Sequence, residues 1–164
     1  MKEKIIEKTL EFLDTNKIEY KYQEHEAVFT VDDIKRVGLK IDGIGIKTLF
    51  LRDRKGERFY LVALNDQKRL DLKKLALKLE EKKLSFATEE NLDNFLKVKS
   101  GSVTPLALIF NEQKNVKLIL DKDIFEAEKI NMHPNKNTAT VTFDNNNFKK
   151  LLNILSEDYK LFEL

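Results

Sequence analysis

The chain has 164 residues, of which 41% are apolar and 35% charged, a balance typical of a globular protein able to bury a substantial core. It contains no cysteine, which excludes disulfides, thiolate metal ligands and a cysteine nucleophile. The net charge is only +2, lower than is usual for a protein that grips a long stretch of nucleic acid, so any contact with RNA should be local.

The first segment of the chain is charged and amphipathic. Residues 3–16 place Ile6, Leu10 and Leu13 on one face at helical spacing, which predicts a helix rather than a signal peptide. Because no apolar run approaches the length of a membrane span, we expect no membrane contact and a cytoplasmic location.

A strand and a short helix are expected next. Residues 19–23 alternate between polar and aromatic side chains and predict a strand. Thr30, with Asp33 three residues later, has the pattern of an N-terminal cap for a helix over residues 31–37, which Gly38 would end. Val28 and Phe29, the two apolar residues before this cap, are expected to pack into the protein interior.

The most apolar part of the chain has the pattern of a β-hairpin. Residues 47–52 and 58–64 are almost continuously apolar and are separated by a short turn, so we expect both strands in the interior of a sheet. After the hairpin, Asp71 and Thr88 are suitable caps for two helices, the first of them over residues 72–82.

The second half of the chain predicts further short strands and a final helix. Residues 106–110 and 116–120 predict two strands joined by a polar turn, and residues 138–143 are β-branched and alternating, which predicts another. Residues 123–130 are ambiguous and fit a short helix followed by a strand. The last helix is expected over residues 148–155, after a run of Asp and Asn suited to its cap.

Helices and sequence-local hairpins therefore alternate along a chain that has no linker, internal repeat or low-complexity segment. We predict a single domain over residues 1–164 of the α+β (mixed α/β) class, with a mixed, mostly antiparallel sheet flanked by helices. The fold class alone does not indicate a function, which has to come from particular residues.

One loop combines two residue types that are rare in this chain, which has only five glycines and two prolines. Gly101 permits a backbone angle closed to other residues, and Pro105 fixes its own angle just before an apolar run. Such a loop, with Ser102 inside it, can present spare backbone N–H groups to an anion, a carbonyl oxygen or a developing oxyanion. The alternative is an ordinary turn, which these residues alone do not exclude.

Lys47 and the two histidines are the other candidates for chemistry. Most lysines are solvated, but Lys47 begins an apolar strand, where an ammonium can hold a phosphate or polarise a carbonyl. His25 and His133 lack acidic neighbours and make a poor metal site, so we predict no metal and no cofactor, and a lone histidine is more often structural. A serine hydrolase would pair Ser102 with His133, but the sequence has no Gly-x-Ser-x-Gly elbow and no evident third triad member.

Four segments of the sequence are informative when taken together. They are His25-Glu-Ala-Val-Phe-Thr30, Gly45-Ile-Lys-Thr-Leu-Phe-Leu51, Gly101-Ser-Val-Thr-Pro-Leu106 and Met132-His-Pro-Asn-Lys-Asn-Thr-Ala-Thr-Val141. In this order they resemble the motifs of the YbaK/ProX-type editing domains, a family that deacylates mischarged tRNA. The resemblance runs from about residue 24 to residue 155, nearly the whole chain. Each motif alone is a weak signal, but four in the correct order are a strong one.

The resemblance implies a curved mixed sheet with helices packed around it and a pocket at the strand ends. It implies that Lys47 positions the substrate electrostatically, and that Gly101, Ser102 and the adjacent backbone hold the ester without a covalent nucleophile. His133 would stand in the wall that selects the amino acid. The implied substrate-binding residues are His25, Val28, Phe29, Thr30, Ile44, Pro105, His133, Asn135 and Asn137.

The function that the resemblance implies is that of a free-standing trans-editing hydrolase, with Ala-tRNA(Pro) as the expected substrate. Water would attack the ester with assistance from the neighbouring ribose hydroxyl. The expected partners are the acceptor end of tRNA(Pro) and, transiently, prolyl-tRNA synthetase. The alternatives are a deacylase for Cys-tRNA(Pro) or another small aminoacyl group, a catalytically silent module that binds tRNA or a partner, and a small-ester hydrolase unrelated to RNA.

Overall fold

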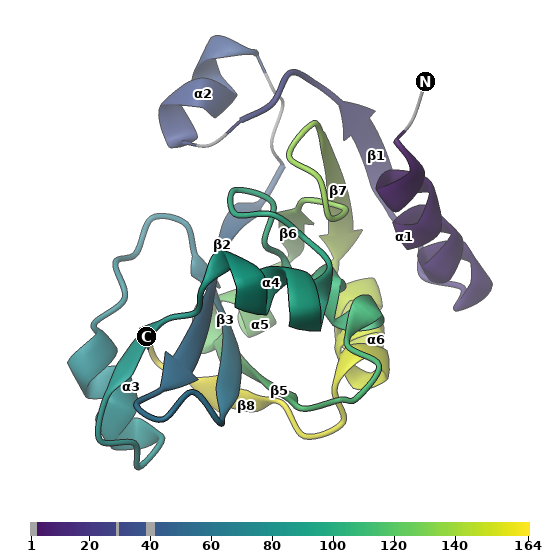
Figure 1. Ribbon diagram of the computed structural model, residues 1–164. Helices are drawn as coiled ribbons and strands as arrows, with labels where there is room; N and C mark the ends of the chain where they lie inside the picture. Colours follow the sequence, from purple (N-terminus) through teal and green to yellow (C-terminus); the bar gives the residue numbers. More distant parts are fainter. Residues whose placement is uncertain (1–2, 29, 39–41) are drawn as a thin grey trace.

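An eight-stranded sheet, in the order β1-β7-β6-β2-β3-β5-β8 with β4 added to β2, forms the centre of the computed structural model (Figure 1). The structure describes residues 3–28, 30–38 and 42–164. The strands are β1 (Lys21–Glu24), β2 (Ile44–Asp53), β3 (Phe59–Asn65), β4 (Leu84–Phe86), β5 (Val116–Asp121), β6 (Lys129–Met132), β7 (Ala139–Asp144) and β8 (Lys160–Phe162). The helices are α1 (Lys4–Thr15), α2 (Val31–Arg36), α3 (Leu72–Lys78), α4 (Glu89–Leu96), the 3-10 helix η1 (Pro105–Phe110), α5 (Lys122–Glu126) and α6 (Asn145–Leu155). Within the described ranges, no helix has both the length and the apolar character needed to cross a membrane.

β2 is the strand that joins the two halves of the sheet. On one edge it pairs antiparallel with β3 from Ile46 to Arg52. On the other edge it pairs parallel with β6 only at Ile44 and Gly45, and antiparallel with β4 only from Leu51 onwards. Four strand pairs are antiparallel and three are parallel among the described residues, which confirms the predicted mixed sheet with a narrow antiparallel majority.

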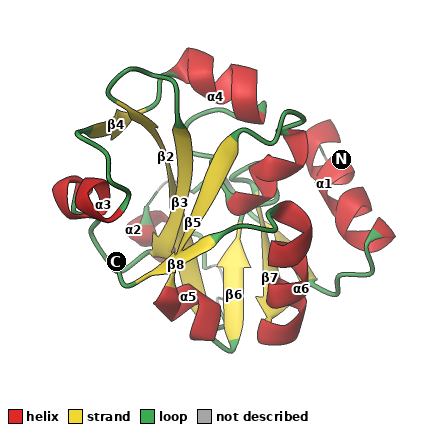
Figure 2. Ribbon diagram, turned by 90° about the horizontal axis from the view of Figure 1, so that it is seen from below, coloured by secondary structure: helices red, strands yellow, loops and turns green. Residues whose placement is uncertain are grey.

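β3 is an interior strand, as its apolar sequence predicted, and its side chains alternate between two cores. Phe59, Leu61 and Ala63 face the larger core, which α1, α4, η1, α5 and α6 complete. Tyr60 and Val62 face a smaller core together with α3. Figure 2 shows this division, with α3 on one side of β3 and α1 and α6 on the other. Each buried leucine of such a core contributes about 1.5–3 kcal/mol by leaving water.

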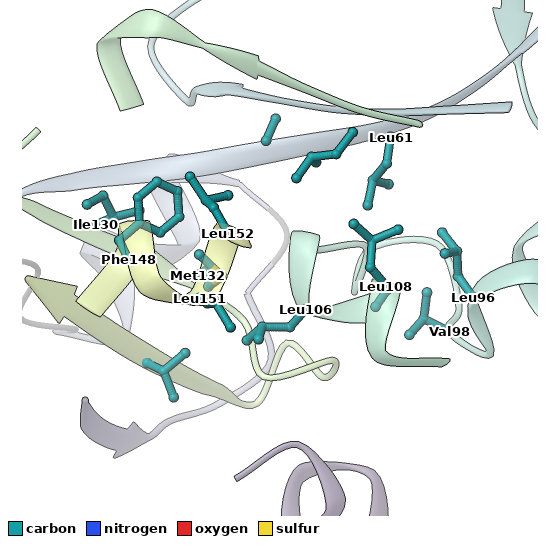
Figure 3. Close-up of a cluster of buried hydrophobic side chains, with 14 of the residues drawn as sticks. Leu61, Leu96, Val98, Leu106, Leu108, Ile130, Met132, Phe148, Leu151 and Leu152 are labelled. Carbon is teal, nitrogen blue, oxygen red and sulfur yellow. The ribbon is translucent and has the colours of Figure 1, made fainter. Parts of the chain in front are cut away.

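Residues 106–110 form the 3-10 helix η1 and not the predicted strand. Pro105 takes the first helical position, where its fixed backbone angle suits a helix, and the Thr104 hydroxyl caps the turn by accepting from the Leu106 N–H. Leu106 and Leu108 are buried in the larger core, where Figure 3 shows them between side chains of α4 and α6. An apolar run this short fits a buried helix as well as a strand, so its pattern could not decide between them.

The predicted helix caps at Thr30, Asp71 and Thr88 are confirmed, whereas α6 begins at Asn145, three residues earlier than predicted. Thr30 and Thr88 each form a capping box with the residue three positions later, and the Asp71 carboxylate accepts from two backbone N–H groups of α3. Each such cap contributes about 1 kcal/mol. α3 is shorter than predicted and ends at Lys78, because Glu80 adopts a left-handed conformation with φ +58°. β4 and β8 were not predicted, since strands this short carry little periodicity.

The start of β2 is fixed by close contacts with β6. Gly43 has φ +91°, and a Cβ atom at this position would overlap the backbone of Lys129. The Asn131 side-chain amide donates to the carbonyl oxygens of Asp42 (2.9 Å) and Ile44 (3.0 Å). Glycine is therefore needed at position 43 both for its conformation and for the close approach of the two strands.

Replacing Gly43 by Ala should lower the free energy of unfolding by about 3 kcal/mol, because the left-handed backbone penalty is added to the overlap with Lys129. Urea denaturation measures the change. Gly56→Ala is the matched control: Gly56 has φ +71°, but a Cβ there meets no atom closer than 3.9 Å. That variant should lose only about 1–2 kcal/mol. Equal losses in the two variants would show that the approach of Lys129 is not a constraint.

Candidate functional site

The four sequence motifs converge on one cavity of about 280 Å³ beside β2. One wall comes from the segment around the start of α2, a second from β2, a third from the loop before η1 and a fourth from the segment after β6. The lining residues are Val28, Thr30, Ile34, Ile46, Lys47, Thr48, Asp66, Gly101, Val103 and His133. Segments that are far apart in the sequence therefore meet at one place in the fold.

Beside this cavity, one edge of β2 has a stretch of backbone without a strand partner in the part of the chain that the structure describes. The Gly45 carbonyl accepts from the Asp66 N–H (3.0 Å), whereas the Phe50 carbonyl accepts from the Ala87 N–H (2.9 Å) on the other edge. Because the backbone groups of a strand alternate between its two edges, the N–H and C=O of Thr48 point away from β3. The pairing with β6 stops before Thr48 and the pairing with β4 starts after it, so these groups have no strand partner among the described residues. The cavity therefore offers polar backbone groups to a ligand.

The loop before η1 is held by its own hydrogen bonds. Gly101 has φ +86°, which confirms that the position needs the backbone freedom of glycine. The Ser102 N–H donates to the Lys99 carbonyl (3.1 Å), and the Ser102 side chain is buried and does not line the cavity. The Ser102 amide is thus already used within the loop, whereas its neighbours Gly101 and Val103 line the cavity.

Lys47 and Asp66 place a cation and an anion in the cavity wall. The Lys47 side chain is partly buried and forms no ion pair with any described residue. Asp66 follows β3 and lies outside the four motifs, so nothing in its sequence context marked it as a site residue. A cavity with an unpaired ammonium suits a ligand that brings a phosphate or a polarised carbonyl.

His133 presents a neutral ring to the cavity. Its Nδ1 lies 3.1 Å from the Ala139 carbonyl oxygen, which can only accept, so Nδ1 carries the proton and Nε2 keeps its lone pair. Burial is the main cause that lowers the pKa of His133, and the nearby His25 lowers it further. At neutral pH the ring is therefore uncharged, and it can pack against an apolar group or accept a hydrogen bond.

His25 lies beside the cavity wall without lining it. Its Nδ1 lies 2.6 Å from the Glu26 carbonyl oxygen and its Nε2 lies 2.8 Å from the Thr140 hydroxyl, so both ring nitrogens are engaged. The ring ties the segment before α2 to β7. Within the parts of the chain that the structure describes, no three His, Asp or Glu side chains gather as a metal site requires.

Two buried asparagines hold segments of the chain around the cavity in place. Asn137 holds Val28 in place, because its carbonyl accepts from the Val28 N–H (3.1 Å) and its side-chain amide donates to the Val28 carbonyl (3.2 Å). Asn135 donates to the Thr9 hydroxyl (2.9 Å) and to the Leu106 carbonyl (3.3 Å), which joins α1 to η1. These buried side chains position the wall and do not reach the cavity.

The remaining predicted site residues have different positions. Thr30 lines the cavity and also caps α2. Ile44 packs against the larger core and Pro105 is buried at the start of η1, and neither lines the cavity. Phe29 lies outside the described residues. Ile34, Ile46 and Thr48 line the cavity but were not singled out, although two of them lie inside the second motif.

Comparison with known proteins gives the family that the four sequence motifs resemble. The family described as "Aminoacyl-tRNA editing domain" matches residues 25–151. The chain is 34% identical over 152 residues to the prolyl-tRNA editing protein ProX of Acetoanaerobium sticklandii, and the match covers 93% of each chain. It is also 35% identical over 133 residues to the prolyl-tRNA synthetase associated domain-containing protein 1 of Danio rerio, covering 80% of this chain and 72% of that protein.

Solved structures share the fold. A crystal structure of a candidate trans-editing enzyme for prolyl tRNA synthetase superposes with a TM-score of 0.76 at 20% identity, covering 100% of this chain and 98% of that one. The hypothetical protein APE2540 gives a TM-score of 0.71 at 18% identity, covering 94% of this chain and 97% of that one. The predicted α+β fold is confirmed, as are the family and the enzyme class of aminoacyl-tRNA deacylase predicted from the motifs. The chain belongs to the family of aminoacyl-tRNA editing domains.

Proposed function

We propose that this chain is a trans-editing deacylase that hydrolyses the ester of Ala-tRNA(Pro). The relatives named for prolyl-tRNA editing and for association with prolyl-tRNA synthetase support tRNA(Pro) as the substrate, with a transient contact to the synthetase. The observation that carries the proposal is the Lys47 ammonium, which has no ion-pair partner among the described residues and lies in the same cavity as the Gly101 loop. A cation and a row of backbone groups are what a phosphate-bearing ester needs for binding.

The proposed roles follow from the position of each wall. Lys47 binds the phosphate of the terminal nucleotide, which places the ester inside the cavity. The backbone of Gly101 and Val103 lies next to the ester carbonyl, whose oxygen becomes negative in the transition state. The alanyl methyl group is directed to the apolar wall that Val28 and Ile34 form, with His133 beside them.

The hydrolysis itself needs no protein nucleophile. A water molecule adds its oxygen to the ester carbonyl carbon and gives up a proton, the bond from this carbon to the ribose oxygen breaks, and the ribose oxygen takes up a proton. The products are free alanine and deacylated tRNA. In this proposal the neighbouring 2′-hydroxyl of the terminal adenosine orients the water and takes part in its proton transfer. Ser102 is buried and both ring nitrogens of His25 are engaged, so neither side chain is placed to do this.

The primary test is a deacylation assay over several charged tRNAs. The protein should hydrolyse Ala-tRNA(Pro) faster than Cys-tRNA(Pro), Pro-tRNA(Pro) or Ala-tRNA(Ala). Binding of these tRNAs without turnover would instead support a silent binding module. A simple model ester hydrolysed as fast as the aminoacyl-tRNA would support a small-ester hydrolase.

Replacing Lys47 by Ala should lower the rate of Ala-tRNA(Pro) deacylation at least about tenfold, equivalent to about 1.4 kcal/mol of transition-state stabilisation. Thermal unfolding should change little, because Lys47 has no ion-pair partner among the described residues. Lys117→Ala is the matched control, since Lys117 is an exposed strand lysine on β5 of the same sheet. An unfolded Lys47→Ala protein would make Lys47 a structural residue and contradict this role.

A tRNA(Pro) ending in 2′-deoxyadenosine should be deacylated at least about 100-fold more slowly than the natural substrate, since proton transfer in the transition state contributes about that much. Single-turnover kinetics measure the rates. A tRNA with a deoxynucleotide at the preceding cytidine controls for altered binding and should react normally. Undiminished hydrolysis of the 2′-deoxy substrate would point to a protein group acting directly.

Shrinking the wall at His133 should relax the selection for small amino acids. Proline has two more carbons than alanine, and overpacking costs about 1–3 kcal/mol, enough to separate rates by about ten- to a hundredfold. His133→Ala should therefore raise the rate of Pro-tRNA(Pro) hydrolysis relative to Ala-tRNA(Pro). His133→Gln, which keeps more of the side-chain volume, should change this ratio less. An unchanged ratio in an active His133→Ala protein would remove His133 from the selecting wall.

A further inference from the structure

Asp66 is a carboxylate in the cavity wall that the proposed hydrolysis does not use. It lines the cavity described above and also a smaller adjoining one, which Gly45 and His133 line as well. The side chain is partly buried, and Oδ1 accepts from the Gln67 amide (3.0 Å). Among the described residues it has no cationic partner. A carboxylate kept partly out of water without a cation is suited to bind one from outside.

The turn that contains Asp66 is held in place by hydrogen bonds and an ion pair. The Asn65 side chain accepts from the Gln67 N–H (3.0 Å), and the Asn65 carbonyl accepts from the Lys68 N–H (2.9 Å). The fully buried Asp121 forms an ion pair with Lys68 (3.0 Å) and accepts from the Asn65 N–H (3.4 Å). This network ties the turn to β5, so the position of Asp66 is set by the fold.

Gly45 makes room for the Asp66 carboxylate. Its backbone is not left-handed, so its conformation does not require glycine. A Cβ atom at position 45 would, however, overlap the Asp66 Oδ2 atom. The Gly45 carbonyl also accepts from the Asp66 N–H (3.0 Å), which holds the two residues side by side. The second motif therefore includes a glycine that lets an acidic side chain lie directly over β2.

The two charges of the cavity are separated along β2. Lys47 is two residues beyond Gly45 on the same face of β2, so the Cα atoms of these two residues are about 7 Å apart. Asp66 lies over Gly45, at the other end of this interval. No ion pair joins Lys47 to Asp66. A cavity with a separate carboxylate and ammonium is complementary to a ligand with a separate cation and anion. The 3′ end of an aminoacyl-tRNA has both, an α-ammonium group on the amino acid and a phosphate on the terminal nucleotide.

We propose that Asp66 binds the α-ammonium group of the aminoacyl ester. This inference rests on the proposed function, in which Lys47 binds the terminal phosphate. Asp66 makes the site selective for esters with a free α-amino group. Esters whose nitrogen is acylated, or whose amine is replaced by a hydroxyl, leave the carboxylate without its partner and bind more weakly.

The test uses three non-hydrolysable analogues and isothermal titration calorimetry. Each is 3′-amino-3′-deoxyadenosine 5′-phosphate, joined through an amide to alanine, to lactic acid or to N-acetylalanine. The wild-type protein should bind the alanyl analogue about tenfold more tightly than the other two, as expected for a hydrogen-bonded charge pair. Asp66→Asn, which keeps the shape and the acceptor for Gln67, should reduce this preference to less than about threefold by weakening only the alanyl analogue.

Two further variants sharpen the comparison. Gly45→Ala keeps the charge of Asp66 but displaces its carboxylate, and it should lose the preference as Asp66→Asn does. Asp93→Asn removes an exposed carboxylate on α4 and should keep the wild-type preference. Circular dichroism confirms folding of each variant.

The outcomes separate the two proposals. If the wild-type protein shows no preference for the alanyl analogue, or does not bind it measurably, the proposed role of Asp66 is wrong. This outcome needs no variant. A preference that survives in Asp66→Asn overturns this role as well. If the preference depends on Asp66 but Ala-tRNA(Pro) is not deacylated, the ammonium site stands and the proposed function fails.

Discussion

The structure depends on how β2 is shared between its neighbours. β3 accompanies β2 along one edge, but the other edge is divided between β6 at its start and β4 at its end. Thr48 lies in the interval between them, where the backbone has no strand partner among the described residues. An open strand edge commonly invites pairing with another chain. Here the loop before η1, the start of α2 and the segment after β6 surround it, which converts an unpaired edge into the wall of a cavity.

Buried polar side chains hold this cavity in shape. Asn137 fixes Val28 through two hydrogen bonds, Asn135 joins α1 to η1, and Asp121 fixes the turn that carries Asp66. None of the three lines the cavity. A polar group enclosed in a low-dielectric interior is costly unless it is hydrogen-bonded, so such groups define a single arrangement of the segments that they join. The precision of the site therefore comes from residues behind it as much as from residues in it.

Local chemistry in the sequence was sufficient for much of the fold and for part of the site. The Thr30 cap, the interior strand β3 and the left-handed Gly101 each depend on residues close to them in the chain, and each was predicted correctly. The 3-10 helix η1 was not, because its five apolar residues suit a buried strand equally well. Asp66 was missed for a different reason: its importance arises only when the fold brings it over Gly45.

The bond between Val28 and Asn137 has a consequence for how the protein is made. These residues are 109 positions apart in the sequence. β1 likewise cannot pair before β7, its only described strand partner, has been synthesised. During synthesis the ribosome releases Lys47 and the Gly101 loop long before Asn137. Contacts of such long sequence separation form late, because a large loop has to close first. A nascent chain that ends before β7 therefore contains every residue that lines the cavity but lacks contacts that hold the cavity walls together, so the cavity forms only after β7 has been made.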